Sequence, residues 1–136
     1  MRKKRYLEKL EVFEQEKEFM ESYTIADDVT KRALLYALQV CVDVVMDVAA
    51  MTTKDLGLAV EDDYTNIEKL EREKVLASEE AELIRRFNGL RNAIVHKYNR
   101  LDLVAVQEGL DNIEELYVVL DKLVEVVERQ GALEER

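Results

Sequence analysis

Apolar residues recur along the chain at spacings of three and four, as in amphipathic α-helices, and no stretch alternates as a strand would. Helix breakers are scarce, since the 136 residues include four glycines and no proline. The spacing predicts four long helices and one short one, at residues 2–22, 28–52, 64–73, 78–100 and 103–129. Because the connections are short, we expect an all-α fold, a single domain over residues 1–136 folded as an up-and-down bundle.

Residues that commonly end helices stand at the predicted boundaries. Candidate N-caps are Asp27 or Asp28, Asp62 or Asp63, Ser78 and Asp102. The pair Leu56-Gly57 marks the end of the second helix, and Gly131 is expected to close the last one. The third long helix is expected to end near residues 98–100.

The apolar positions also predict the core. The second helix is apolar on nearly every face and should be the most buried. The lone cysteine, Cys41, is expected to be a small core residue within it. The other interior positions expected are Tyr6, Leu10, Phe13 and Met20, then Ala81, Ile84, Phe87, Leu90, Ile94 and Val95, and finally Leu103, Val106, Leu110, Ile113, Leu120, Leu123 and Val127.

Composition narrows the function classes. With 20 basic and 30 acidic residues the net charge is -10, so the overall field would repel nucleic acid. The sequence contains no run of 18 apolar residues, so no membrane span is predicted. The basic N-terminus also lacks the apolar stretch of a secretory signal. We therefore expect a cytoplasmic protein. One cysteine excludes an internal disulfide and a cysteine-cluster zinc site, and no metal or cofactor is predicted.

One window departs from this acidic balance. Residues 85–100, RRFNGLRNAIVHKYNR, hold five Lys or Arg and no acid. The C-terminal dipole of a helix favours cations in its last turn, which explains Lys97 and Arg100. It does not explain Arg85, Arg86 and Arg91, which lie one to three turns upstream. The window therefore predicts an anion-binding patch, and Arg85, Arg86, Lys97 and Arg100 are its candidate RNA-binding residues.

The same window contains the only histidine, His96, and the groups needed to cleave a phosphodiester. Histidine can act as general acid or base near neutral pH, and Arg91 can bind a phosphate through two hydrogen bonds. Asn92 lies one turn before His96 and can orient the histidine or the phosphate. RNA supplies its own 2′-hydroxyl, so this chemistry needs no metal. The alternative is that His96 is structural or simply exposed, and that Tyr98 only packs.

Helical geometry separates the two main groups. Arg91 lies about 140° around the helix from His96, so one helix face does not assemble the site. A partner chain could supply the second half. Asp43 and Asp47 lie one turn apart in the apolar second helix, where two buried like charges would be unfavourable. They either form a narrow solvent strip, or one of them, Asp43 in preference to Asp47, pairs with Arg91 or His96. Metal binding by these two aspartates is the least favoured alternative.

The stretch LRNAIVHKYNRLD resembles the R-x-x-x-x-H-x-Y signature of the HEPN superfamily, in its R-N-x-x-V-H-x-Y form. The likeness is closest to HepT-like toxins of toxin–antitoxin pairs. The segment KRALLYALQVCVDVVMDVAA looks like the second helix of that family, and the LGLAVEDDYTNIEKL connection follows at the expected place. The resemblance covers about residues 1–130. It departs in the loop after Gly57, which reads LAVEDD and lacks the proline and serine common there.

The resemblance implies a homodimeric, metal-independent endoribonuclease toxin of a type VII-like pair, with two motifs facing each other across a cleft. Arg91 and His96 match the catalytic pair, Asn92 the polar residue beside the arginine, and Tyr98 the motif tyrosine. A minimal nucleotidyltransferase would be the antitoxin and add AMP to Tyr98, blocking the RNA substrate. Two alternatives stay open. One is a non-catalytic dimeric adaptor that binds a nucleotide or docks a nucleotidyltransferase, and the other is a bundle without any site.

Overall fold

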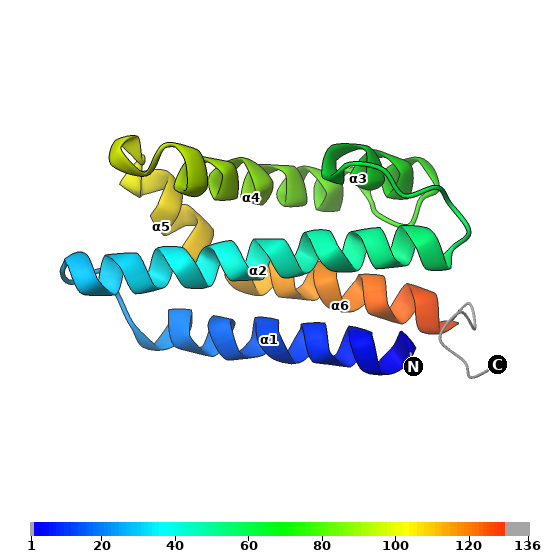
Figure 1. Ribbon diagram of the computed structural model, residues 1–136, viewed down its shortest axis with the longest axis horizontal. Coiled ribbons are helices and arrows are strands. Elements are labelled where there is room, and N and C mark those ends of the chain that lie inside the picture. Colours follow the sequence, from blue (N-terminus) through cyan, green and yellow to red (C-terminus); the bar gives the residue numbers. More distant parts are fainter. Residues whose placement is uncertain (1, 130–136) are drawn as a thin grey trace.

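The computed structural model describes residues 2–129, in which all regular structure is helical (Figure 1). The elements are α1 (Arg2–Ser22), α2 (Asp28–Asp55), α3 (Asp63–Arg72), α4 (Ser78–His96), the 3-10 turn η1 (Tyr98–Arg100), α5 (Leu103–Asp111) and α6 (Ile113–Arg129). The long helices α1, α2, α4 and α6 lie along the long axis, and each runs opposite to the long helix before it (Figure 1). The predicted all-α, up-and-down bundle is confirmed.

Helix α2 is the centre of the bundle, because it packs against α1, α3, α4, α5 and α6. Its buried side chains include Leu34, Leu38 and Val45, each at most 1% exposed. Within the described residues α2 is also the one helix long and apolar enough to cross a bilayer, and most of that stretch is buried in the bundle. Its apolar character is therefore accounted for by core packing.

Short side chains close the helix ends largely as predicted. Asp27 is the N-cap of α2, and its carboxylate accepts a hydrogen bond from the Thr30 amide at 2.8 Å. Asp62 and Asp102 cap α3 and α5 in the same way. The chain turns after α2 at Gly57, whose φ of +83° suits glycine.

The predicted cap of α4 was wrong by one residue. Ala77 occupies the N-cap and Ser78 already lies within the helix. The carboxylate of Glu80 takes over the capping role, because it accepts a hydrogen bond from the Ala77 amide at 2.8 Å.

The last predicted helix is divided in two. The backbone of Asn112, with φ −105° and ψ 13°, ends α5, and α6 begins at Ile113. In Figure 1, α5 runs obliquely across the end of the bundle before α6 joins the long helices. Apolar residues keep their spacing across this break, so the pattern concealed it. Gly131 lies outside the described residues.

The predicted core is largely confirmed, with two exceptions. Tyr6, Phe13 and the remaining predicted positions are buried or pack in part against the buried cluster. Val95 and Leu103, however, are 42% and 48% exposed. Val95 lies in the last full turn of α4 and Leu103 at the first position of α5, where few elements remain to cover them.

Candidate active site

Arg91 on α4 and Asp43 on α2 meet across the interface between these helices. Nε of Arg91 donates a hydrogen bond to Oδ1 of Asp43 at 2.9 Å, and Nη1 donates to Oδ1 of Asn92 at 3.2 Å. Both side chains remain partly exposed, at 30% for Arg91 and 44% for Asp43. The Nη2 group has no hydrogen-bond partner among residues 2–129. Arg91 is thus anchored through Nε and Nη1 and free at Nη2, and the predicted contact with Asp43 is present.

Asp47, one turn further along α2, has a different partner. Nζ of Lys9 on α1 donates to Oδ2 of Asp47 at 2.7 Å, and the aspartate side chain is 56% exposed. Such an exposed pair contributes about 0–1 kcal/mol to stability. The two aspartates therefore differ, since Asp43 contacts the predicted catalytic arginine and Asp47 lies on the solvent strip.

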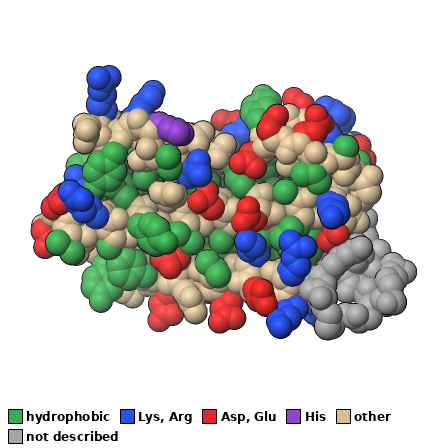
Figure 2. Space-filling model, in the orientation of Figure 1, with side chains coloured by type: hydrophobic (Ala, Val, Ile, Leu, Met, Phe, Trp, Pro, Cys, Tyr) green, Lys and Arg blue, Asp and Glu red, His purple; other side chains and the backbone are tan. Residues whose placement is uncertain are grey.

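His96 is the last residue of α4, and its side chain is exposed. It makes no hydrogen bond to any residue that the structure describes. Asn92, predicted to orient either the histidine or the phosphate, instead accepts a hydrogen bond from Arg91. Figure 2 shows the histidine at the molecular surface, with Lys or Arg side chains on either side of it. The imidazole is therefore open to a ligand or to a second chain.

Tyr98 lies in η1, immediately after the end of α4. Its ring packs against the core, and its hydroxyl is enclosed without a hydrogen-bond partner among the described residues. The ammonium group of Lys31, on α2, lies 5.6 Å from the centre of the Tyr98 ring. The predicted modification site is thus covered in this conformation, and a cation from another helix lies over its ring.

The predicted RNA-binding residues separate into two groups. Lys97 and Arg100 are exposed beside His96 and form no ion pair within residues 2–129. Arg85 is instead held inside the fold, where Nη2 donates to Oε1 of Glu71 at 2.8 Å. That bond raises the pKa of the Arg85 guanidinium and lowers the pKa of the Glu71 carboxyl. Arg85 therefore adds little free positive charge to the surface.

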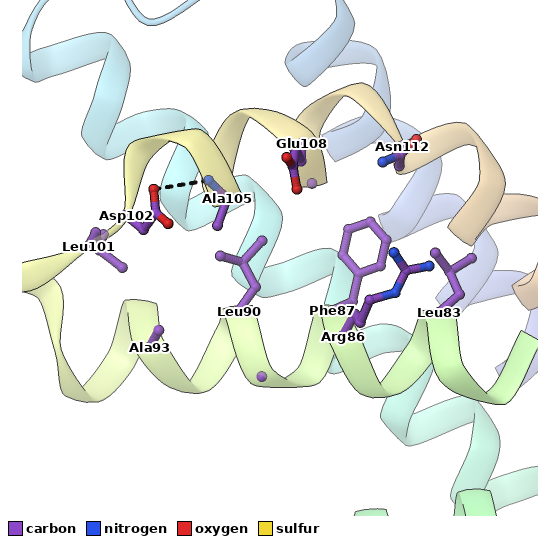
Figure 3. Close-up of a pocket in the computed structure, with 12 residues that line it drawn as sticks. Leu83, Arg86, Phe87, Leu90, Ala93, Leu101, Asp102, Ala105, Glu108 and Asn112 are labelled. Carbon is purple, nitrogen blue, oxygen red and sulfur yellow. Dashed lines mark hydrogen bonds between the residues drawn. The ribbon is translucent and has the colours of Figure 1, made fainter. Parts of the chain in front are cut away.

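Arg86 lies at a cavity on another side of α4, between that helix and α5 (Figure 3). The cavity has a volume of about 390 Å³, and its walls are mainly apolar, with Phe87 and Leu90 from α4. Glu108 and Asn112 come from the opposite side of the cavity (Figure 3). Five residues of helix separate Arg86 from Arg91 and rotate it by about 140°. Arg86 is therefore not part of the group around Arg91.

Carboxylates, by contrast, gather on the α3 side of Arg91. A smaller cavity of about 220 Å³ is lined by Asp63, Asn88 and Asn92, among others. Partial desolvation, together with the charges of Asp47 and Asp43, raises the pKa of the Asp63 carboxyl, and Arg91 opposes this shift. Within residues 2–129 no three His, Cys, Asp or Glu side chains are grouped so that they could hold a metal ion. The surroundings of Arg91 are thus partly acidic on the side of α3.

Two further cations, Lys31 and Arg32, adjoin the site and were missed in the sequence. They come from the first turns of α2, which lie beside Tyr98 because α2 and α4 run in opposite directions. A signal was present, since residues 29–42 form a second stretch without any acid. By its apolar residues alone, that stretch indicates only a core helix.

Comparison with known proteins identifies relatives over nearly the whole chain. The family model described as "Ribonuclease HepT-like" matches residues 3–123. An Archaeoglobus fulgidus protein named "Putative RNase" is 54% identical over 129 residues, which cover 95% of this chain and 98% of the relative. A similarly named protein of Methanocaldococcus jannaschii is 57% identical over 74 residues, 54% of this chain and 85% of the relative.

Solved structures share the fold. A tri-AMPylated HEPN toxin of Shewanella oneidensis, in complex with MNT antitoxin, superposes with a TM-score of 0.72 at 16% identity, covering 91% of this chain and 96% of that chain. The cytosolic protein YutE of Bacillus subtilis, of unknown function, superposes with a TM-score of 0.74 at 16% identity, covering 98% and 94%.

Proposed function

Since the chain belongs to the HepT-like ribonuclease family, we propose that it is a metal-independent endoribonuclease toxin acting in the cytoplasm. One observation carries the proposal. Arg91 is fixed through Nε by Asp43 and through Nη1 by Asn92 and leaves its Nη2 group free, within two helical turns of the exposed His96. A fixed guanidinium with a free Nη2 group can donate hydrogen bonds to the non-bridging oxygens of a phosphodiester.

In the proposed reaction the 2′-hydroxyl of the RNA attacks the adjacent phosphorus. The bond from O2′ to phosphorus forms and the bond from phosphorus to O5′ breaks, giving a 2′,3′-cyclic phosphate and a 5′-hydroxyl. His96 acts as general base or general acid on the protons that these two oxygens exchange. Arg91 stabilises the additional negative charge that develops on the phosphate oxygens. Asp43 and Asn92 keep Arg91 in position.

We further propose that a second copy of the chain completes the site, because Arg91 and His96 do not share one helix face. Exposed apolar side chains support this arrangement. Val29 and Tyr36 lie on the same outer stripe of α2 as Asp43 and are 74% and 64% exposed, and Val95 on α4 is 42% exposed. Figure 2 shows apolar side chains gathered on the face that also presents the histidine. Exposed apolar groups of this kind are typical of surfaces that pack against another chain.

The proposed antitoxin is a minimal nucleotidyltransferase that transfers AMP to Tyr98. The structural likeness to an AMPylated toxin in complex with its antitoxin supports this partner. Because the Tyr98 hydroxyl is enclosed, η1 has to open before the transfer. The attached nucleotide would then prevent the turn from closing and would occupy the space beside His96.

Incubation of the purified protein with RNA in the presence of a chelator tests the proposal. We expect cleavage with cyclic-phosphate ends, and its loss in Arg91→Ala and His96→Ala. Arg72→Ala is the matched control, because Arg72 is an exposed arginine on α3. Intact RNA with the unmodified protein, or equal cleavage by all variants, would show that the proposal is wrong.

A non-catalytic adaptor is the second candidate, favoured by the observation that no described residue orients His96. In that function the same surface docks a nucleotidyltransferase or binds a nucleotide without cleaving RNA. Tight binding of the nucleotidyltransferase together with intact RNA would identify it.

A further inference from the structure

We infer that Lys31 and Arg32 on α2, with Lys97 and Arg100 around Tyr98, form a phosphate-binding subsite that holds the RNA strand beside the catalytic pair. This inference rests on the proposed ribonuclease function and extends it. It assigns a role to two residues of α2 that lie far in sequence from the R-x-x-x-x-H-x-Y motif.

The position of the subsite follows from the packing of α2 against α4. Arg91 contacts Asp43, and closer to the start of α2 the ammonium group of Lys31 lies over the Tyr98 ring. Twelve residues of α2 separate Asp43 from Lys31, or about 18 Å at 1.5 Å per residue. His96 lies between them in the chain, two residues before Tyr98. Lys31 and Arg32 therefore lie at the same end of the bundle as His96 and Tyr98.

Charge distinguishes this end of the bundle from the surface around it. Among the residues that the structure describes, the four cations of the subsite have one acidic ion-pair partner, Asp28. Its carboxylate accepts from Nε of Arg32 at 2.7 Å and lies 3.8 Å from Nζ of Lys31. Lys97 and Arg100 have no ion-pair partner within residues 2–129. Elsewhere Lys69, Lys122 and Arg85 each contact a carboxylate. In a chain of net charge -10, this group is a local excess of positive charge.

The hydroxyl of Tyr98 is a second and independent observation. It is enclosed and lacks a hydrogen-bond partner among the described residues, which is unfavourable for a polar group. It belongs to a ring over which Lys31 already lies. A small movement of η1 would let the hydroxyl donate to a phosphate oxygen that Lys31 also binds. The ring would then be available to stack on a base, as aromatic side chains do in single-strand binding sites.

The test measures RNA binding apart from cleavage. In the His96→Ala background the RNA stays intact, and fluorescence anisotropy gives the dissociation constant of a labelled single strand over a series of salt concentrations. Lys31→Gln and Arg32→Gln are the test variants. Lys54→Gln is the matched control, because Lys54 is an exposed cation in the last turn of the same helix. Thermal melting establishes that each variant is folded.

We expect Lys31→Gln and Arg32→Gln each to weaken binding by about 3- to 10-fold at low salt, with Lys54→Gln unchanged. Each lost phosphate contact should reduce the slope of log affinity against log salt by about 0.7, the value for single strands. If the parent binds RNA and these slopes do not change, the subsite is refuted while the ribonuclease proposal stands. If the two variants weaken only the binding of the nucleotidyltransferase, the surface docks protein and the inference is wrong. If the parent binds no RNA and the unmodified protein cleaves none, both proposals fail.

Discussion

Removal of the Asp43 carboxylate should reduce the rate of RNA cleavage much more than it reduces the stability of the protein. The bond from Arg91 to Asp43 is a single hydrogen bond of 2.9 Å between side chains that are 30% and 44% exposed. Pairs with this exposure contribute about 0–1 kcal/mol, and solvent screening favours the lower part of that range. Asp43→Ala should therefore lower the melting temperature by no more than about 2–5 °C.

The expected effect on cleavage is larger, because Arg91 loses the group that holds its guanidinium in place. Restricting a free arginine side chain costs up to about 2 kcal/mol of conformational entropy, which corresponds to a rate loss of about 5- to 30-fold in Asp43→Ala. Arg91→Ala removes the phosphate contact itself and should cost about 100- to 1000-fold. Asp43→Asn keeps an oxygen acceptor and should lie between the parent and Asp43→Ala.

Single-turnover cleavage and thermal melting of the four single variants and of one double variant form the assay. The matched control is Asp47→Ala, since Asp47 lies one turn away on α2 and pairs with Lys9 instead. In the Arg91→Ala background the loss of Asp43 should have no additional effect, because its proposed action passes through Arg91. Equal rate losses in Asp43→Ala and Asp47→Ala, or additive losses in the double variant, would refute the reasoning.

Other predictions concern the fold and its titration. Leu38→Ala should cost about 2–5 kcal/mol of unfolding free energy, measured by urea titration, because Leu38 is fully buried. Leu7→Ala should cost far less, because Leu7 is exposed. Equal losses in the two variants would contradict the assigned core. Burial raises the pKa of the Cys41 thiol, so a thiol reagent at pH 8 should modify Cys41 only when the protein unfolds. Fast modification of the native protein would contradict the burial of Cys41. A hydrogen bond to Glu14, then burial, raises the pKa of Tyr117 to about 12 from an ordinary value of 10.0. The folded state then retains a proton that the unfolded state loses, so this contribution is complete below pH 10 and is lost as pH rises towards 12. Tyr117→Phe should remove that part of the alkaline decline, as measured by urea titration at a series of pH values.

The candidate site was only partly visible in the sequence. Residues 85–100 stood out by charge, and the motif identified Arg91 and His96 within them. Arg85 and Arg86 belong to the same charged window. In the structure, however, Arg85 bonds Glu71, and Arg86 lies at a cavity between α4 and α5. A count of charges along the chain does not say where each side chain points, because successive residues of a helix face different neighbours.

Local rules explain what the sequence determined by itself. The helix spacing, the caps at Asp27, Asp62 and Asp102 and the turn at Gly57 depend on contacts within a few residues, so they can be recognised in the chain. The break at Asn112 is the main local feature that the sequence did not predict, because the apolar spacing continues across it while the backbone changes direction.

Only the tertiary structure decided which side chains meet. The contact of Arg91 with Asp43 joins residues 48 positions apart, and Lys31 reaches Tyr98 from another helix. These contacts depend on the rotation and axial register of α2 against α4. An apolar pattern determines the face that a helix buries, but many pairings along that face bury similar apolar area. The sequence therefore supplied the groups for phosphodiester chemistry, and the packing of the bundle selected the aspartate that holds the arginine and the cations that surround the tyrosine.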